Sequence, residues 1–573
     1  MSDIQQPKNI AIEALALPEI VNAIAQHIRF HWVLAKACLV CKAWKGAWTP
    51  FLWRNLNFNR TEDEIPSSIR KYGYHVKSLD YHNPEDPHLE LVLPFCPNLQ
   101  RLVLTDTFIT MRVLAPFLKK NHFGRTLRSI ELEVYAIQAK ELLPILAKHC
   151  RHLEYIDILF MQPDMSVVKH SVLMRLLKSC SHLRELALAR VSIVDDDDGD
   201  GDDGTEEIMG EEGTSDGTDE EGEEIDDQSR KQSRLEILDL GQTDQSDKSL
   251  LELLQQCSNL LGIYFGLNGK LTDNFIVKIP DLCPKVDSLS FYQPLGLTSS
   301  GIAQLLQGTP NNCLELRYLK LTGSPTNDQM VKQVAYSQAQ SLVTLNLQRS
   351  SMVTDDSMEA ILKYCCRLKS LLLKGTNVTP AIMQGPQDNW GCYETLDQLD
   401  IRGIGILSLP RLYDPEDWRI ENNREVFKII KRRIEMLPNL ERLAMSFFGL
   451  RKELIQGFGN DDDGDGRESQ ENGTENDSEK QGVKVDHDEL PPPPPLPPTA
   501  NVSKKRVRLQ VLSIQGMVDK FSAEDFSIFL KNYPSLRVLM LSGGRINSEL
   551  EHMLRVANIK YQDPREMILA LDN

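Results

Sequence analysis

The most regular feature of the chain is a short phrase, L-x-x-L-x-L, in which apolar residues alternate with other residues. The alternation in its last three positions predicts a short β-strand with every second side chain buried. The first apolar residue of each phrase lies at Val76, Leu99, Leu127, Leu153, Leu183, Leu235, Leu260, Val286, Leu316, Leu342, Leu368, Leu396, Leu440, Leu509 and Leu536. Most steps between these anchors are 23 to 30 residues, and the three long steps are 52, 44 and 69 residues. This period predicts a repeat array in which short parallel strands stack over one continuous core.

A second pattern follows several of these strands and predicts one helix per repeat. It consists of an apolar residue, a threonine and a helix start, as in Leu271-Thr272-Asp273 and Val353-Thr354-Asp355. Thr and Asp suit a helix N-terminus because their side chains accept hydrogen bonds from free backbone N–H groups. Apolar residues follow four positions after the threonine, at Ile276, Ile302 and Met358, and we expect them to face inward.

Cysteine opens seven copies of the phrase, giving C-x-x-L-x-x-L-x-L. These cysteines are Cys96, Cys150, Cys180, Cys257, Cys283, Cys313 and Cys365. The pattern resembles the cysteine-containing leucine-rich repeat, over about residues 70 to 545. The resemblance implies an α/β solenoid, a curved parallel sheet with outer helices. Equivalent positions on such a solenoid form a row and not a tetrahedron, so we expect these thiols to pack as small apolar groups without binding metal.

The stretch before the array has a different pattern, with apolar residues at helical spacing. Pro18-Glu19 can begin a helix that places Ile20, Ile24 and Ile28 on one face. A second helix is predicted to carry Leu34, Ala37, Cys38, Cys41 and Trp44 at i, i+3, i+4 and i+7. A helical unit this small must bury its apolar faces against something else.

These residues resemble an F-box. The matching positions are Leu17, Pro18, Ile20, Ile24, Ile28, Val40, Cys41, Trp44, Leu52 and Trp53. An F-box followed by leucine-rich repeats is the order found in F-box/LRR proteins. The resemblance implies that the listed residues bind a Skp-type adaptor, and through it the cullin and RING subunits of an SCF ubiquitin ligase. The repeats would then select the protein substrate.

A metal or redox site is the alternative interpretation of the same stretch. His27, His31, Cys38 and Cys41 are ligands of suitable type for zinc. However, the histidine pair precedes the cysteine pair, which reverses the zinc-finger order, and both cysteines lie on the predicted packing face. We therefore predict no metal, cofactor or catalytic residue here or elsewhere in the chain.

Charge divides the chain into a repeat array and two acidic insertions. The 573 residues carry a formal charge of −18, yet residues 195–227 hold 19 acids and no Lys or Arg, and residues 460–490 hold 12 acids and 3 basic residues. The remainder is therefore +10, from −18 + 19 + 9. Such tracts lack apolar residues and are expected to be disordered. The predicted organisation is a flexible N-terminus (1–12), an F-box (13–60), repeats (70–194), a disordered acidic insertion (195–231), repeats (232–457), a disordered acidic and proline-rich insertion (458–506), and the last repeats with a C-terminal cap (507–573).

Two further features concern location. The polar start of the chain shows no secretory signal, and no apolar run approaches the roughly 20 residues of a membrane-spanning helix. We therefore expect a location in the cytoplasm or nucleus. The segment ELPPPPPLPPT (489–499) predicts polyproline II, and KKRVR (504–508) resembles a nuclear import signal.

The strand residues between the buried leucines should line the concave face of the array. This gives seven candidate substrate-binding residues, Tyr264, Tyr292, Tyr318, Lys320, Lys374, Arg402 and Arg442, whereas earlier repeats offer Glu131, Glu133 and Asp157. Aromatic and basic side chains together suit an acidic or phosphorylated partner.

The function predicted from these patterns is a non-catalytic substrate receptor of an SCF-type ubiquitin ligase, binding neither membrane nor nucleic acid. A rival hypothesis is an acidic repeat scaffold or chaperone that binds histones or other basic proteins through residues 195–227. The first hypothesis needs the N-terminal helices and the second needs only the tract.

Overall fold

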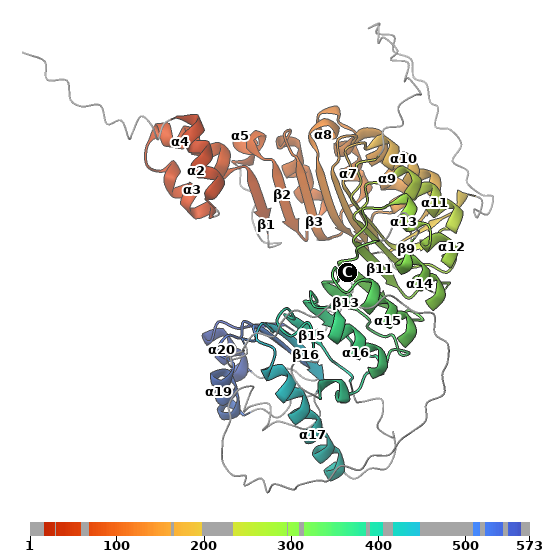
Figure 1. The fold of residues 1–573 in the computed structure, drawn as a ribbon. Coiled ribbons are helices and arrows are strands. Elements are labelled where there is room, and N and C mark those ends of the chain that lie inside the picture. The colour runs from red at the N-terminus through yellow and green to blue at the C-terminus, as the bar shows by residue number, and fades with distance from the viewer. Residues whose placement is uncertain are drawn as a thin grey trace, which may run out of the picture. The chain divides into compact units, whose positions relative to one another are not determined.

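The computed structural model describes residues 17–28, 30–58, 68–161, 166–196, 233–294, 296–308, 314–384, 390–404, 416–446, 508–515, 522–542 and 548–562 (Figure 1). The chain divides into two compact units. The first unit comprises Met1–Leu297 and Gly308–Leu314, and the second comprises Thr298–Gln307 and Glu315–Asn573.

The first unit begins with three helices and continues as a parallel sheet. The helices are α2 (Pro18–His27), α3 (His31–Cys38) and α4 (Lys42–Leu52). The strands of the sheet are β1 (Asn55–Phe58), β2 (Ser78–His82), β3 (Arg101–Thr107), β4 (Ser129–Val134), β5 (Tyr155–Phe160), β7 (Glu185–Ala189), β9 (Ile237–Asp244), β10 (Gly262–Leu267) and β11 (Ser288–Tyr292). Each strand pairs in parallel with the next one named.

Helices cover one side of this sheet (Figure 1). They are α5 (Ile69–Tyr72), η1 (Gly73–His75), α6 (Asp86–Val92), η2 (Leu93–Phe95), α7 (Met111–Lys119), α8 (Asn121–Thr126), α9 (Ala139–His149), α10 (His170–Ser179), α11 (Asp247–Gln256), α12 (Asp273–Ile276) and α13 (Ile279–Leu282). A short side sheet of β6 (Ser166–Lys169) and β8 (Val191–Val194) pairs with the end of β9. The opposite side of the main sheet carries no helix of the described residues, and we call it the open face.

The second unit repeats the same plan. Its strands are β12 (Tyr318–Thr322), β13 (Thr344–Asn346), β14 (Ser370–Leu372), β15 (Gln398–Asp400), β16 (Arg442–Ser446), β17 (Val511–Gln515), β18 (Val538–Ser542) and β19 (Lys560–Gln562), all paired in parallel in this order. Its helices are α14 (Ser299–Gln307), α15 (Asp328–Ser337), α16 (Asp355–Tyr364), η4 (Pro380–Met383), α17 (Glu416–Glu435), α19 (Ala523–Asn532) and α20 (Ser548–Val556).

The anchors predicted from the sequence are the core of both units. All fifteen, from Val76 to Leu536, are at most 5% exposed. Burying a side chain of this size contributes roughly 1.5–3 kcal/mol. The architecture is therefore the leucine-rich-repeat solenoid that the period predicts, and it forms because each strand is too short to be stable without its neighbours.

The repeated cysteines also lie in the core. Cys96, Cys150, Cys180, Cys257, Cys283 and Cys365 are at most 1% exposed, and Cys313 lies outside the described residues. The Cys180 and Cys283 thiols lie 3.5 Å from the carbonyl oxygens of Cys150 and Cys257, the equivalent residues of the preceding repeats. Burial raises the pKa of Cys96 and of Cys180 to about 12. These thiols therefore remain protonated and act as packing groups.

Threonine and aspartate at the helix starts bind one another across repeats, which the sequence pattern does not reveal. Asp86 begins α6, and its two carboxylate oxygens accept hydrogen bonds from the backbone N–H of Thr110 (2.8 Å) and from its hydroxyl (2.6 Å). Asp328 accepts the same pair from Thr354 (2.8 and 2.6 Å). Two further pairs are Asp247 with Thr272 and Asp355 with Thr379. Each helix start is thereby tied to the next, and we call these bonds the Asp–Thr ladder.

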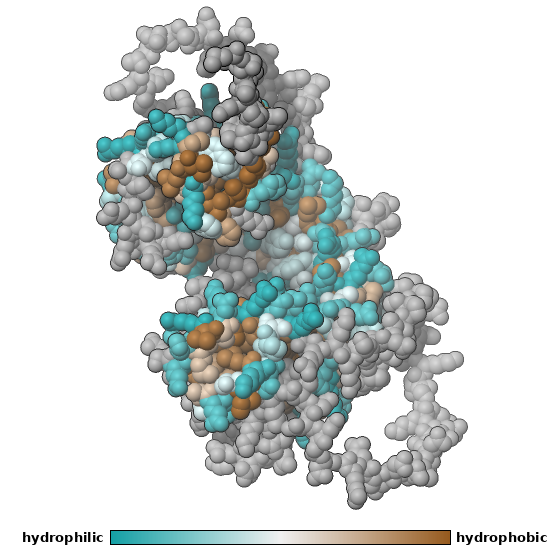
Figure 2. Space-filling view, turned by 90° about the vertical axis from the view of Figure 1, so that its left-hand side faces the viewer, coloured by the Kyte–Doolittle hydropathy of each residue, from teal (hydrophilic) through white to brown (hydrophobic). Residues whose placement is uncertain are grey.

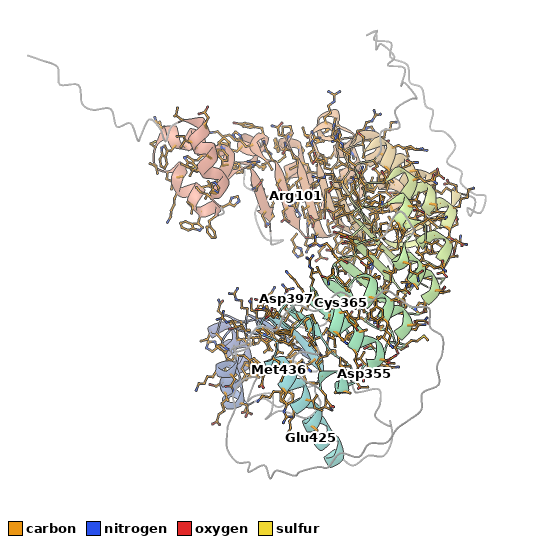
Figure 3. All side chains as sticks on the ribbon, viewed as in Figure 1. Arg101, Asp355, Cys365, Asp397, Glu425 and Met436 are labelled. Carbon is orange, nitrogen blue, oxygen red and sulfur yellow. The ribbon has the colours of Figure 1, made fainter. Side chains whose placement is uncertain are left out.

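One segment takes part in two steps of this ladder. The Thr354 hydroxyl donates a hydrogen bond to Asp328, and it caps α16 by accepting one from Asp356 N (3.4 Å). The next residue, Asp355, accepts the hydrogen bond of Thr379 N. Asp355 and Cys365 flank α16 at its start and just past its end (Figure 3).

The first acidic insertion begins later than the predicted residue 195. Asp195 accepts hydrogen bonds from Ser246 N through both carboxylate oxygens (3.2 and 3.1 Å), and so takes the aspartate place of the ladder. Asp196 accepts one from Ser171 N (3.1 Å). Burial raises the pKa of Asp195, but hydrogen bonds from Ser249 and Ser246 outweigh it and leave that pKa lowered. Residues 197–232 and 447–507 lie outside the described residues, so disorder and polyproline II there stay predictions.

The single helix predicted over Leu34 to Trp44 is wrong. The chain turns at Leu39-Val40, so α3 ends at Cys38 and α4 starts at Lys42. Cys41 lies between them with extended backbone, and its sulfur accepts a hydrogen bond from Trp44 N at 3.4 Å. Cys41 is thus an exposed helix cap and not a packing residue, because capping competes with helix continuation at this position.

A buried arginine holds α17 in the second unit. Arg433 is 1% exposed and donates to the carbonyl oxygens of Met383 (3.1 Å) and Gln384 (3.0 Å). Its guanidinium also lies 4.8 Å from the ring centre of Trp390. These contacts join α17 to η4, the short turn that stands in the place of a full helix.

The ladder predicts the effect of changing Thr354. Thr354→Val should lower the free energy of unfolding by about 2 kcal/mol, because it removes a helix cap and a hydrogen bond to the partly buried carboxylate of Asp328. Thr354→Ser keeps both bonds and should recover most of the loss. Urea unfolding at pH 7 checks the pair. An unchanged free energy of unfolding in Thr354→Val would contradict the contribution of the two hydroxyl hydrogen bonds.

The insertion boundary gives a second prediction. Replacing residues 197–227 by a Gly/Ser linker of equal length should leave the melting temperature nearly unchanged, because so acidic a composition buries little apolar surface. Asp195→Ala in the intact chain should lower the unfolding free energy by about 1–2 kcal/mol. Thermal unfolding of the two variants beside the parent checks both. A large loss from the linker replacement would show that the tract packs on the repeats.

Candidate functional site

Helices α2, α3 and α4 form a small core of their own. Val21, Leu34 and Trp48 are buried at its centre. Around them pack the partly buried Ile24, Ile28, Ala37, Cys38, Trp44, Ala47, Phe51 and Leu52. The rings of Trp44 and Trp48 lie 6.0 Å apart. Each helix therefore contributes to a shared interior before any partner is considered.

Several large apolar side chains of the same helices remain outside this core. Leu39 is 84% exposed, Val40 63%, Phe30 62% and Trp32 59%. Leu17 and Ile20 are also exposed. Figure 2 shows hydrophobic side chains, in brown, gathered on these helices in the upper part of the view. Contiguous exposed apolar surface of this kind marks a binding site.

The ten residues predicted to bind an adaptor separate into three groups. Leu17, Ile20, Val40 and Cys41 are exposed and available to a partner. Ile24, Ile28, Trp44 and Leu52 pack against the helical core. Trp53 stacks on Tyr72 of α5, with ring centres 5.2 Å apart. The side chain of Pro18 lies outside the described residues.

Exposed Phe30, Trp32 and Leu39 were missed because the F-box pattern does not include them. Phe30 and Trp32 lie 6.3 Å apart between ring centres, and Lys36 lies 4.8 Å above the Trp32 ring. The sequence pattern also gave no sign of the turn that exposes Leu39.

The seven predicted substrate residues belong to both units. Tyr264 on β10 and Tyr292 at the end of β11 are in the first unit, and both are half-buried. The second unit holds Tyr318 at the start of β12, Lys320 in the same strand, Lys374, Arg402 and Arg442. The seven residues therefore do not belong to a single compact unit.

Two of the predicted cations are not available as free charges. Lys320 is only 8% exposed. Arg402 makes bonds of 2.9, 3.1 and 2.5 Å to the carboxylate of Asp400, which also accepts from the Gln348 amide at 3.1 Å. Asp400 lies between the buried Leu399 and Ile401, a position that the repeat pattern does not mark as an ion-pair partner. Arg442, at the start of β16, is exposed.

The open face of the first unit is acidic. Strand pairing places Glu131, Asp157 and Asp239 in one row, and Asp80 two strands before Glu131 continues it. Burial raises the pKa of Asp157, although a hydrogen bond from the Tyr155 hydroxyl (3.2 Å) opposes that shift. Burial, and then the charge of Asp157, raise the pKa of Glu185. Glu131 and Asp157 were predicted from the sequence, whereas Glu185 and Asp239 join them only through strand register.

Tyr264 belongs to this acidic neighbourhood. Burial is the main cause of its raised pKa, and the charges of Asp287, Asp239 and Glu185 add to it. Its ring lies over Gly262 of the same strand, where an added Cβ would be 2.7 Å from the ring. The absence of a side chain at Gly262 therefore leaves the space that the Tyr264 ring occupies. An aromatic ring among carboxylates suits a cationic partner, in contrast to the acidic partner predicted for the seven residues.

The described residues contain no group of three or more His, Cys, Asp or Glu side chains that could hold a metal ion, and this includes the pairs His27–His31 and Cys38–Cys41. None of the described helices combines the length and the apolar character that crossing a membrane requires.

Solved structures with similar architecture include repeat proteins of several kinds. The structure of the Rad7 and Elc1 complex in yeast matches at 14% identity over 71% of this chain and 93% of that chain, with a TM-score of 0.37. An internalin (InlF) of Listeria monocytogenes strain 4b F2365 matches at 13% over 78% and 99%, with a TM-score of 0.35. The functional domain of InlJ from Listeria monocytogenes, which includes a cysteine ladder, matches at 13% over 70% and 64%, with a TM-score of 0.32. No family model and no curated protein matches the sequence.

The acidic face predicts a pH-dependent stability. The folded pKa of Asp157 is raised, so its contribution to stability is present below its unfolded pKa of about 3.9 and is lost as pH rises through the folded value. Asp157→Asn should therefore raise the melting temperature at pH 7, and the gain should vanish towards about pH 4. Thermal unfolding between these pH values checks this.

Asp80→Asn is the matched control. Asp80 lies in the same row and accepts a hydrogen bond from Asn57 at 3.0 Å, so its change should bring no gain at pH 7. An equal gain from both variants would assign the effect to overall charge and contradict the role of burial at Asp157.

Proposed function

We propose that the chain is a non-catalytic substrate-recognition subunit of an SCF-type cullin-RING ubiquitin ligase. Helices α2 to α4 act as an F-box that binds a Skp-type adaptor, and the repeats bind a protein substrate. The observation that carries the proposal is the turn between α3 and α4. It exposes Leu39 and Val40 beside the Val-Cys-Lys-x-Trp phrase that resembles an F-box.

The physical support is a set of exposed apolar side chains that do not pack in the helical core. The helical core already buries Val21, Leu34 and Trp48, so Leu39 and Val40 add nothing to it. Leaving two such side chains in water forgoes roughly 3–6 kcal/mol of burial, which an adaptor could recover. The adaptor surface therefore consists of Leu17, Ile20, Leu39 and Val40 with the adjoining Phe30 and Trp32.

The open face of the first unit is the favoured substrate surface. Its row of carboxylates around Tyr264 suits a basic segment, whereas Arg442 and Lys374 of the second unit suit an acidic one. Repeat proteins present such rows of side chains on one extended surface, and binding there requires no catalytic group. The rival hypothesis of an acidic scaffold depends on residues 195–227, which are largely outside the described residues.

The adaptor proposal predicts the effect of two exposed residues. Leu39→Asp with Val40→Asp should weaken binding of a Skp-type adaptor by at least about a hundredfold, because both anchors leave an apolar interface. Trp44 is not used in this test because it packs in the helical core. Titration of purified adaptor against the full chain checks the affinity.

Met352→Asp is the matched control. Met352 is 58% exposed on the repeats of the second unit, so the change places a charge on an apolar surface residue elsewhere. It should leave adaptor affinity unchanged. Normal adaptor binding by the folded Leu39/Val40 double variant would refute the F-box assignment.

A further inference from the structure

The edge of the first sheet where its strands begin carries a regular row of side chains. The residue before each strand donates its N–H to the carbonyl of the equivalent residue one strand earlier. Lys77 N donates to Arg54 O (2.8 Å), Gln100 N to Lys77 O (2.8 Å) and Arg128 N to Gln100 O (2.8 Å). The first seven members of this series, which we call the edge row, are Arg54, Lys77, Gln100, Arg128, Glu154, Arg184 and Glu236.

Charges alternate in the later part of the edge row. Arg128 lies 3.6 Å from Glu154, and Arg184 lies 2.7 Å from Glu236. Each cation is therefore followed by a carboxylate on the next strand. Opposite charges on neighbouring strands stabilise a sheet, and like charges destabilise it.

The first part of the row breaks this rule. Arg54 and Lys77 are neighbours of like charge, on strands about 4.8 Å apart. The next position is Gln100, an amide in place of a carboxylate. Among the described residues, neither Arg54 nor Lys77 has an ion-pair partner, and both side chains are exposed. The two charges therefore lack the compensation that the later cations have.

A pocket of about 540 Å³ lies at this place. Its lining is Pro50, Phe51, Arg54, Tyr74, His75, Lys77, Asn98, Gln100 and Thr126. No carboxylate is among these lining residues, so the charged groups that face the pocket are cationic. The rings of Phe51 and Tyr74 add an apolar wall, and the Asn98 amide is held by a bond to Tyr74 O at 2.7 Å.

We propose that this pocket binds an acidic segment of a protein partner, with a carboxylate or phosphoryl group between Arg54 and Lys77. An apolar side chain next to that acidic residue would lie against Phe51 and Tyr74. Two cations can share one oxyanion through charge-assisted hydrogen bonds, which removes their mutual repulsion. The pocket lining joins α4 of the N-terminal helices to the first repeats, and the exposed residues assigned to the adaptor are not part of it.

The test uses the full chain and three labelled peptides of one sequence, in which Glu, Gln or phosphoserine stands beside Leu and Tyr. At about 50 mM salt, where screening is weak, the Glu or phosphoserine peptide should bind at least about tenfold tighter than the Gln peptide. Arg54→Glu with Lys77→Glu should remove this difference. Fluorescence anisotropy measures each affinity, and the melting temperature shows that the exposed changes leave the fold intact.

Arg128→Glu with Arg184→Glu is the matched control, because it changes the net charge equally in the same edge row. This variant should weaken the binding of the acidic peptides less than threefold, because Arg128 and Arg184 are already paired with Glu154 and Glu236. If both double variants weaken peptide binding equally, the effect comes from long-range charge alone, and the proposed site is refuted. A further variant combines Glu62→Gln, Asp63→Asn and Glu64→Gln. If it binds the acidic peptides about tenfold tighter, the pocket binds the chain's own acidic segment, and the proposal of a protein partner is refuted.

Discussion

The structure depends on one recurring backbone clamp. The carbonyl of the residue before each strand accepts N–H groups from two successive residues of the next repeat, as Arg54 O does from Lys77 (2.8 Å) and Ser78 (3.0 Å). This fixes the register of every following strand, because a shift by one residue would turn the buried leucines to water. The Asp–Thr ladder adds a second constraint between helix starts at four of the repeat steps. Surface rows, acidic or alternating, follow from this register.

The sequence predicted the interior better than the surface. The anchors from Val76 to Leu536 recur with a period and are apolar, so burial alone selects one arrangement for them. The cysteines follow the same logic, since a row of equivalent positions cannot surround an ion. Asp195 was assigned to the insertion because it is the first of a run of acidic residues. Its structural role depends on a hydrogen bond from Ser246, which lies 51 positions later in the chain.

Surface chemistry depends on local hydrogen bonds and on strand register, which the periodic pattern does not reveal. Arg402 looks like a free cation until the turn after β15 brings its guanidinium onto Asp400. Cys41 fits the spacing of a packing residue, but the chain turns two residues before it and makes it a cap. In both cases a local hydrogen bond determines the position of the side chain, and the periodic pattern does not predict that bond. Strand register supplies the remaining information, as for Glu185 and Asp239 beside Tyr264.

Arg433 has a consequence for the sequence of the second unit. Its bonds to Met383 and Gln384 and its contact with Trp390 hold α17 against the preceding repeat through side-chain chemistry. Both acceptors are backbone carbonyls, so the side chains of Met383 and Gln384 can vary without removing this attachment. The chemical requirement therefore falls on Arg433, and on Trp390 beneath its guanidinium.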